Sequence, residues 1–126
     1  SFRPRLVPTL AAIAMVAPSI VLIGLAGSTA LGIWRRRGYR VAAEGFADRA
    51  YAADGTLLPR SQPGALLTDP SAAGAQAVRL AREGRCETIC VHADTPGAPL
   101  IAAAVRSGLE EAGFGVRCLA ARGGGT

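Results

Sequence analysis

The sequence contains no lysine, a single histidine, and three cysteines with no Cys-x-x-Cys pair. With so few His and Cys residues we do not expect a zinc site, because structural zinc takes about four Cys or His ligands at close spacing. Aromatic residues make up only 5% of the chain, and the arginines are scattered apart from the run at residues 35–37. With few rings to stack on bases and one short basic run, the sequence argues against nucleic-acid binding.

The three cysteines are predicted to be reduced thiols. If residues 87–92 form a strand, Cys86 and Cys90 lie about 13 Å apart at about 3.3 Å per residue. That separation exceeds the limit of about 7 Å between the Cα atoms of a disulfide. Cys118 is then left over, and the pattern indicates a reducing compartment, which we take to be the cytoplasm.

Length and composition predict one globular domain over residues 1–126, with a flexible Gly-rich tail at 119–126. The chain is 50% apolar and 18% charged, with a mean hydropathy of +0.30, so it is too apolar to be mostly disordered. It is too short for a complete eightfold β/α barrel, which takes about 250 residues. The net charge of +5 comes entirely from arginine, and we attribute it to compositional bias rather than to a phosphate-binding surface.

Residues 6–34 carry no charged side chain and are flanked by arginines. By length this stretch qualifies as a membrane span, and a small membrane-anchored protein is one reading of the chain. Pro18 and the glycines at 24, 27 and 32 instead favour a strand followed by a turn. The regular pattern that follows favours the non-membrane reading, because its first unit begins inside this stretch.

Short apolar runs alternate with Ala-rich amphipathic segments along the chain, which predicts parallel strands joined by helices. Asp69 and Pro70 form a helix start and Gly84 a stop, while Thr95 is the expected cap of the last helix. Between the second strand and Asp69 lies a long irregular loop, and such loops are usually either functional or a sign that an element has been misassigned. The expected strands are 20–24, 39–44, 88–92 and 114–120, and the expected helices are 29–37, 70–83 and 96–112.

Polar side chains follow three of these strands, and the loops at the carboxyl ends of parallel strands converge. We therefore expect these side chains to meet at one rim of the sheet. Acidic, basic, hydroxyl and imidazole groups are all represented there, and the residues concerned are Ser28, Glu44, Asp48, Arg49, His92, Asp94 and Thr95.

Three segments carry a resemblance to a known family. VAAEGFADRAY (41–51), ADGTLLPRSQPGA (53–65) and ICVHADTPG (89–97) resemble, in this order, the carboxyl-terminal half of the LamB/YcsF family. Its members are the A component of the bacterial ATP-dependent 5-oxoprolinase. The resemblance covers residues 9–118.

This resemblance implies a distorted barrel of seven strands and helices, related to the polysaccharide deacetylase superfamily. The implied activity is the ATP-dependent opening of 5-oxo-L-proline to L-glutamate, together with B and C subunits. The sequence departs from the family at Ala93, where a glycine is usual, and it lacks the family's amino-terminal acidic and histidine motifs. We therefore expect a member truncated at its amino terminus, which forms a partial barrel.

Opening a lactam needs an activated carbonyl, a base to guide water and an acid to protonate the departing nitrogen. The expected catalytic residues are Glu44, Asp48, His92 and Asp94, and the expected substrate-binding residues are Ser28, Arg49, Arg60 and Thr95. In this hypothesis His92 acts with Asp94, the two arginines hold a carboxylate or phosphate, and Ser28 offers backbone N–H groups to an anion. No metal ligand is assigned.

Each of these residues also has a structural explanation. Asp48 and Arg49 could fix the long loop, His92 could be a hydrogen-bonded core histidine, and Thr95 could serve only as a helix cap. A catalytically silent module that binds the partner subunits is therefore a further functional reading. A partial barrel should also leave strand edges and part of a sheet face uncovered.

Overall fold

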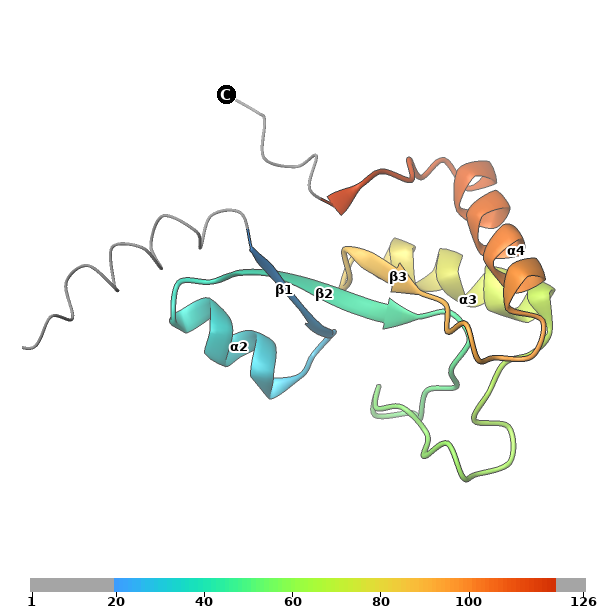
Figure 1. Cartoon of the computed structure of the whole chain (residues 1–126), viewed down its shortest axis with the longest axis horizontal. Coiled ribbons are helices and arrows are strands. Elements are labelled where there is room, and N and C mark those ends of the chain that lie inside the picture. Colours follow the sequence, from blue (N-terminus) through green and yellow to red (C-terminus); the bar gives the residue numbers. More distant parts are fainter. Residues whose placement is uncertain (1–19, 120–126) are drawn as a thin grey trace, which may run out of the picture. The chain divides into compact units, whose positions relative to one another are not determined.

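The computed structural model describes residues 20–119, which form an α/β fold (Figure 1). Two compact units are present, one ending at Ala43 and the other beginning at Glu44. The elements in chain order are β1 (Val21–Leu25), α2 (Thr29–Arg36), β2 (Arg40–Phe46), α3 (Pro70–Glu83), β3 (Thr88–Cys90) and α4 (Ala98–Glu111). The predicted fold class is confirmed, while the seven-stranded barrel type stays a prediction.

The first unit contains β1, α2 and the start of β2. The turn between β1 and α2 passes through Gly27, whose φ of 80° lies in the left-handed region that favours glycine. The backbone N–H of Ser28 closes the turn by donating to Leu25 O at 3.0 Å. The predicted strand and helix are thus both found, each within a residue of its expected bounds.

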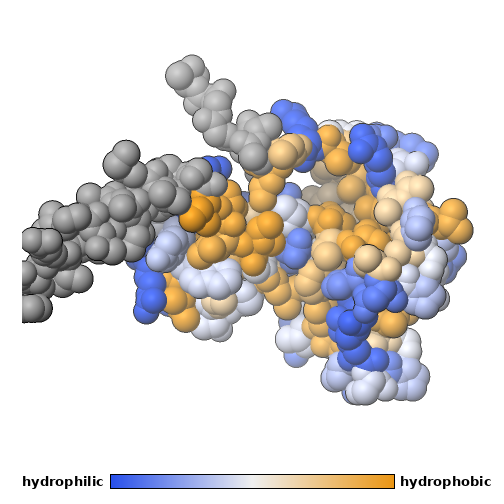
Figure 2. All heavy atoms as spheres, in the orientation of Figure 1, coloured by the Kyte–Doolittle hydropathy of each residue, from blue (hydrophilic) through white to orange (hydrophobic). Residues whose placement is uncertain are grey.

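Apolar side chains remain exposed around β1, in line with the expected uncovered sheet surface. Ile23 is 46% exposed and Ile20, just before the strand, is 47% exposed, and Figure 2 shows apolar surface on this part of the first unit. Within residues 20–119 no helix is long and apolar enough to span a bilayer. The described half of the uncharged stretch, residues 20–34, is a strand, a turn and a helix, and residues 6–19 lie outside the described residues.

In the second unit, β2 and β3 pair in parallel, as predicted. The register places Glu44 opposite Thr88 and Phe46 opposite Cys90. The hydrogen-bonded order of the strands is β1-β2-β3. Both β2 and β3 therefore end at the same edge of the sheet, where the segments that follow them emerge together.

Helix α3 begins and ends where the sequence predicts. The Asp69 side chain accepts a hydrogen bond from Ala72 N at 2.9 Å, Pro70 occupies the first helical position, and Gly84 ends the helix with a φ of 67°. These are local signals that need no tertiary contact, because each one satisfies or removes a terminal backbone group.

The core of the second unit lies between α3, α4 and the strand β3 (Figure 1). The apolar stripe predicted for the last helix is buried at Ile101, Val105 and Leu109. It packs against the small residues Ala73 and Ala77 of α3. Ile89 and Val91, in β3 and just after it, pack partly buried against the same cluster.

Two glycines mark the close approach of α3 and α4. A Cβ at Gly74 would lie 3.0 Å from Ala104 O, whereas a Cβ at Gly108 would meet its nearest neighbours at 3.5 Å. On the outside of this contact lies an open groove of about 810 Å³, lined by residues of both helices. None of the expected site residues lines this groove.

Adding one methyl group at each glycine should have opposite effects on stability. Gly74→Ala forces a side chain against the backbone of α4, and we expect it to lower the free energy of unfolding by about 1–3 kcal/mol. Gly108→Ala meets only ordinary contacts and removes a flexible residue from a helix, so it should be neutral or stabilising by about 0.5–1 kcal/mol. Urea unfolding followed by circular dichroism measures both, and equal effects would contradict the close approach.

Two expectations about the end of the chain were wrong. Residues 114–118 form no strand: Phe114 packs against the core, but Val116 is 45% exposed and this stretch pairs with no strand in the described residues. Thr95 does not cap α4 either. The helix begins at Ala98 after Gly97, and the Thr95 side chain is bonded elsewhere. Residues 120–126, the rest of the expected tail, lie outside the described residues.

Candidate active site

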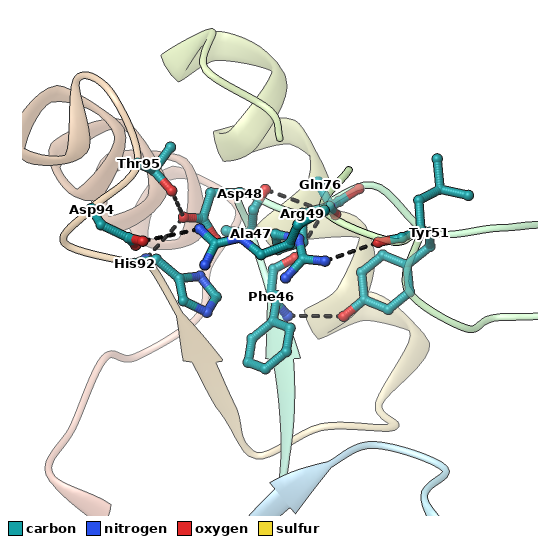
Figure 3. A network of polar contacts seen from close by, with 11 residues as sticks. Phe46, Ala47, Asp48, Arg49, Tyr51, Gln76, His92, Asp94 and Thr95 are labelled. Carbon is teal, nitrogen blue, oxygen red and sulfur yellow. Dashed lines mark hydrogen bonds and ion pairs between the residues drawn. The ribbon is translucent and has the colours of Figure 1, made fainter. Parts of the chain in front are cut away.

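Asp48 lies two residues beyond β2 and is completely buried. One carboxylate oxygen, Oδ2, accepts hydrogen bonds from Thr95 Oγ1 at 2.6 Å and from the backbone N–H of His92 at 2.8 Å (Figure 3). The other, Oδ1, lies 2.9 Å from Nδ1 of the His92 ring. Burial raises the pKa of Asp48, but the hydrogen bonds from Thr95 and His92 outweigh it and hold the pKa below its usual value. Asp48 is therefore a buried carboxylate that stays ionised.

His92 follows β3 by two residues, and its ring is oriented by Asp48 and Phe46. An ionised carboxylate can only accept hydrogen bonds, so Nδ1 of the neutral ring must carry the proton that it shares with Asp48. The Phe46 ring packs edge-on against the imidazole, with 5.0 Å between the ring centroids. Nε2, the other ring nitrogen, has no hydrogen-bond partner within residues 20–119.

This arrangement suits proton transfer. The His92 side chain is 26% exposed, so a small molecule can reach the ring. A neutral imidazole with its Nδ1 proton donated to a buried carboxylate presents an unprotonated Nε2, which can take a proton from water. When the ring becomes charged, the Asp48 carboxylate stabilises it.

Gln76 on α3 fixes the backbone that carries Asp48. Its side-chain amide donates to Phe46 O at 2.8 Å, to Ala47 O at 3.2 Å and to Arg49 O at 2.7 Å. These carbonyls lie at the end of β2 and just beyond it, so Gln76 ties this segment to α3. Gln76 was not among the expected site residues. The available signal was an uncharged polar side chain beside the apolar stripe of its helix.

Arg49 and Thr95 are buried, at 8% and 2% exposure. The Thr95 hydroxyl proton is already donated to Asp48, so Thr95 positions the carboxylate. Arg49 donates from Nη2 to Leu58 O at 2.9 Å. This contact holds the long loop, which is the structural role considered for Arg49 in the sequence analysis. Its Nε is buried with no hydrogen-bond partner in the described part of the chain.

Asp94 and Arg60 form an exposed ion pair at 3.1 Å, with side chains 67% and 47% exposed. The expectation that His92 works with Asp94 is therefore wrong for this structure, because the carboxylate that contacts His92 belongs to Asp48. An exposed pair of this kind contributes about 0–1 kcal/mol to stability. It links the middle of the long loop to the segment after β3.

Neither Glu44 nor Ser28 takes part in these contacts. β2 continues to Phe46, so Glu44 sits inside the strand rather than at its end. Its Oε1 accepts from Thr88 Oγ1 at 3.3 Å. Ser28 belongs to the first unit, where its backbone N–H is already bonded to Leu25 O and its buried hydroxyl has no partner in the described residues. No cluster of three metal-binding side chains was found within residues 20–119.

The family model described as "LamB/YcsF family" matches residues 6–123. The chain belongs to the LamB/YcsF family. The resemblance inferred from the three sequence segments is thereby confirmed. The match covers β2 and β3, the residues Asp48 and His92 that follow them, and the long loop after β2.

Relatives of this LamB/YcsF chain include curated proteins named as the A component of 5-oxoprolinase. The protein from Heliobacterium modesticaldum is 44% identical over 84% of this chain and 46% of its own length. The protein from Chloroflexus aggregans is 45% identical over 84% of this chain and 47% of its own length. Their names denote one part of a multi-subunit complex. The chain spans about half the length of these relatives.

A solved structure is also similar to this chain. The crystal structure of the lactam utilization protein from Thermus thermophilus is similar with a TM-score of 0.73 and 40% sequence identity. The similarity covers 86% of this chain and 47% of that protein. The two chains therefore share a fold over the matched region.

Proposed function

We propose that this chain takes part in the hydrolytic opening of a lactam, as the A component of a 5-oxoprolinase. The observation that carries the proposal is the Asp48–His92 pair, a buried carboxylate and a reachable imidazole, in a chain of the LamB/YcsF family. The relatives' names supply the substrate class: proteins similar to this chain are named for 5-oxoprolinase and for lactam utilization. The proposed reaction converts 5-oxo-L-proline to L-glutamate.

In the proposed mechanism His92 moves protons at Nε2. It takes a proton from water as the water oxygen bonds to the lactam carbonyl carbon. It then gives that proton to the ring nitrogen as the carbon–nitrogen bond breaks, which leaves an amine and a new carboxyl group. Asp48 holds the ring in the correct tautomer and stabilises its charged form between the two steps.

ATP is proposed as the co-substrate of the whole complex, where its terminal phosphoryl group would pass to the carbonyl oxygen and leave ADP. The opened product would then carry the phosphoryl group on its new carboxyl group, and a second water would release it as phosphate. The described residues of this chain supply no phosphate-binding loop. The backbone N–H of Ser28, ahead of α2, already donates to Leu25 O. We therefore assign ATP to the complex with the B and C subunits and assign no residue of this chain to it.

We also propose a cytoplasmic location. All three cysteines, Cys86, Cys90 and Cys118, are free thiols, as predicted. Burial raises the pKa of Cys86 and Cys90, so these thiols stay protonated and unreactive. Persistent free thiols support a reducing compartment.

Reconstitution tests the proposal. The purified chain is mixed with 5-oxoprolinase B and C subunits, and glutamate and phosphate are measured with and without 5-oxo-L-proline. We expect both products to form only when the chain, the partner subunits and the lactam are all present. A stable complex with no lactam-dependent turnover would contradict the proposal and favour the silent binding module instead.

A further inference from the structure

We infer that Arg49 forms a binding site for a carboxylate group carried by the lactam substrate, next to the Asp48–His92 pair. This inference rests on the proposed function and deepens it, because it states which lactams the site selects. A lactam with a ring carboxylate should bind, and the same ring without that group should bind weakly.

The first observation is a buried cation without an acidic partner. Arg49 is 8% exposed, yet no Asp or Glu pairs with it within residues 20–119. Its one hydrogen bond among these residues goes to a neutral carbonyl, Leu58 O, and its buried Nε has no partner there. A buried guanidinium left in this state is costly, so an anion is expected to complete it.

Asp48, the next residue in the chain, does not fill this role. Its Oδ2 accepts from Thr95 and from the backbone of His92, and its Oδ1 contacts the His92 ring. Asp48 therefore binds the imidazole, and the positive charge of Arg49 is left to pair with a different anion. Arg60, the other arginine expected to bind substrate, is exposed and already paired with Asp94.

The second observation is the position of the guanidinium. Arg49 directly follows Asp48 in the chain, and Figure 3 shows its guanidinium group between Phe46 and Tyr51. The Phe46 ring contacts His92 edge-on, and the Tyr51 hydroxyl holds the backbone of Phe46 by accepting from its N–H at 2.9 Å. A small substrate could thus meet the imidazole and the guanidinium at once, bounded by an apolar ring.

Arginine suits a carboxylate in particular. Its planar fork offers parallel N–H groups that match the two carboxylate oxygens. Leu58 O occupies only one N–H of Nη2, and Nη1 makes no hydrogen bond within the described residues. Phosphate shares the same anionic chemistry, and the experiment separates these two sources.

Binding to the unmodified chain provides the first test. Affinities for 5-oxo-L-proline, pyrrolidin-2-one and inorganic phosphate are measured by calorimetry and by the NMR signals of the only histidine. We expect 5-oxo-L-proline to bind about 10–100-fold more tightly than pyrrolidin-2-one, the worth of a charge-assisted contact. Equal affinity, no binding of 5-oxo-L-proline, or tighter binding of phosphate than of 5-oxo-L-proline would each overturn the inference.

Variants provide the second test. Arg49→Lys keeps the charge but loses the fork, and Arg49→Gln loses both. Each should weaken 5-oxo-L-proline binding by about 10–100-fold and leave pyrrolidin-2-one binding unchanged. Arg106→Gln, on the exposed face of α4, is the matched control. If Arg49→Gln does not fold, the Arg49→Lys variant and the unmodified chain still test whether Arg49 binds the carboxylate. Unchanged affinity for 5-oxo-L-proline in Arg49→Lys would count against the carboxylate site.

The outcome is separable from that of the proposed function. If the chain turns over with the B and C subunits but binds 5-oxo-L-proline and pyrrolidin-2-one equally well, the role of Arg49 is rejected and the proposed function is kept. Discrimination between the two lactams without turnover would keep the carboxylate site and reject the function.

Discussion

Replacing Asp48 with alanine is expected to lower the free energy of unfolding by about 3–5 kcal/mol, because it leaves two hydrogen-bond donors unsatisfied at about 1–3 kcal/mol each. The Thr95 hydroxyl and the backbone N–H of His92 would lose their acceptor, a carboxylate that is completely buried. Asp48→Asn keeps the volume and one acceptor oxygen, so its loss should be smaller, about 1–3 kcal/mol. Urea unfolding followed by circular dichroism measures both.

Asp54 offers a matched control for Asp48. Its Oδ1 also accepts two hydrogen bonds, from Thr56 N at 3.0 Å and Thr56 Oγ1 at 2.7 Å, but it is exposed. Because water can replace the lost acceptor, Asp54→Ala should cost less than about 1 kcal/mol. Comparable losses at the two positions would mean that the Asp48 contacts do not form in a buried site.

Replacing His92 with asparagine should reduce lactam-dependent turnover by about 10²–10⁴-fold, the usual contribution of a general acid–base group. The asparagine amide can still donate to Asp48 from near the Nδ1 position, so the fold should persist. What is lost is Nε2, the atom proposed to move the proton. Initial rates of glutamate formation in the reconstituted complex give the measurement, with circular dichroism melting as the check on folding.

His92→Gln helps to interpret the rate. Glutamine carries its amide further from the backbone, toward the Nε2 position, but it also cannot take up a proton at neutral pH. Both variants should therefore be equally impaired if proton transfer is the role of His92. A variant that keeps more than about a tenth of the activity would show that His92 contributes less than a general base should.

The local parts of the fold could be predicted from the sequence because their signals lie close together. Asp69, Pro70 and Gly84 bound α3 through contacts within one or two turns of the chain. The misassigned start of α4 shows the limit of such signals. Thr95 stands before a proline, as a cap would, but its hydroxyl is taken by Asp48, which is distant in sequence. No local pattern contains that contact.

Of the expected site residues, Asp48, His92 and Thr95 are brought into contact, but their pairing was not predicted. Sequence proximity favoured His92 with Asp94, whereas the parallel register determines the actual partner. Phe46 lies opposite Cys90, so the residues two positions beyond each, Asp48 and His92, emerge together. Gln76 was missed for the same reason, since its role depends on where α3 packs relative to the end of β2.

The tautomer of His92 is the most direct test of the claim that Asp48 holds this ring for proton transfer. The chain has one histidine, so ¹⁵N NMR of the untagged, labelled protein shows a single imidazole without ambiguity. With the ring neutral, we predict a proton on Nδ1 and a free lone pair on Nε2, and loss of this preference in Asp48→Asn. A proton on Nε2 in the unmodified chain, or the same tautomer in both proteins, would contradict the account.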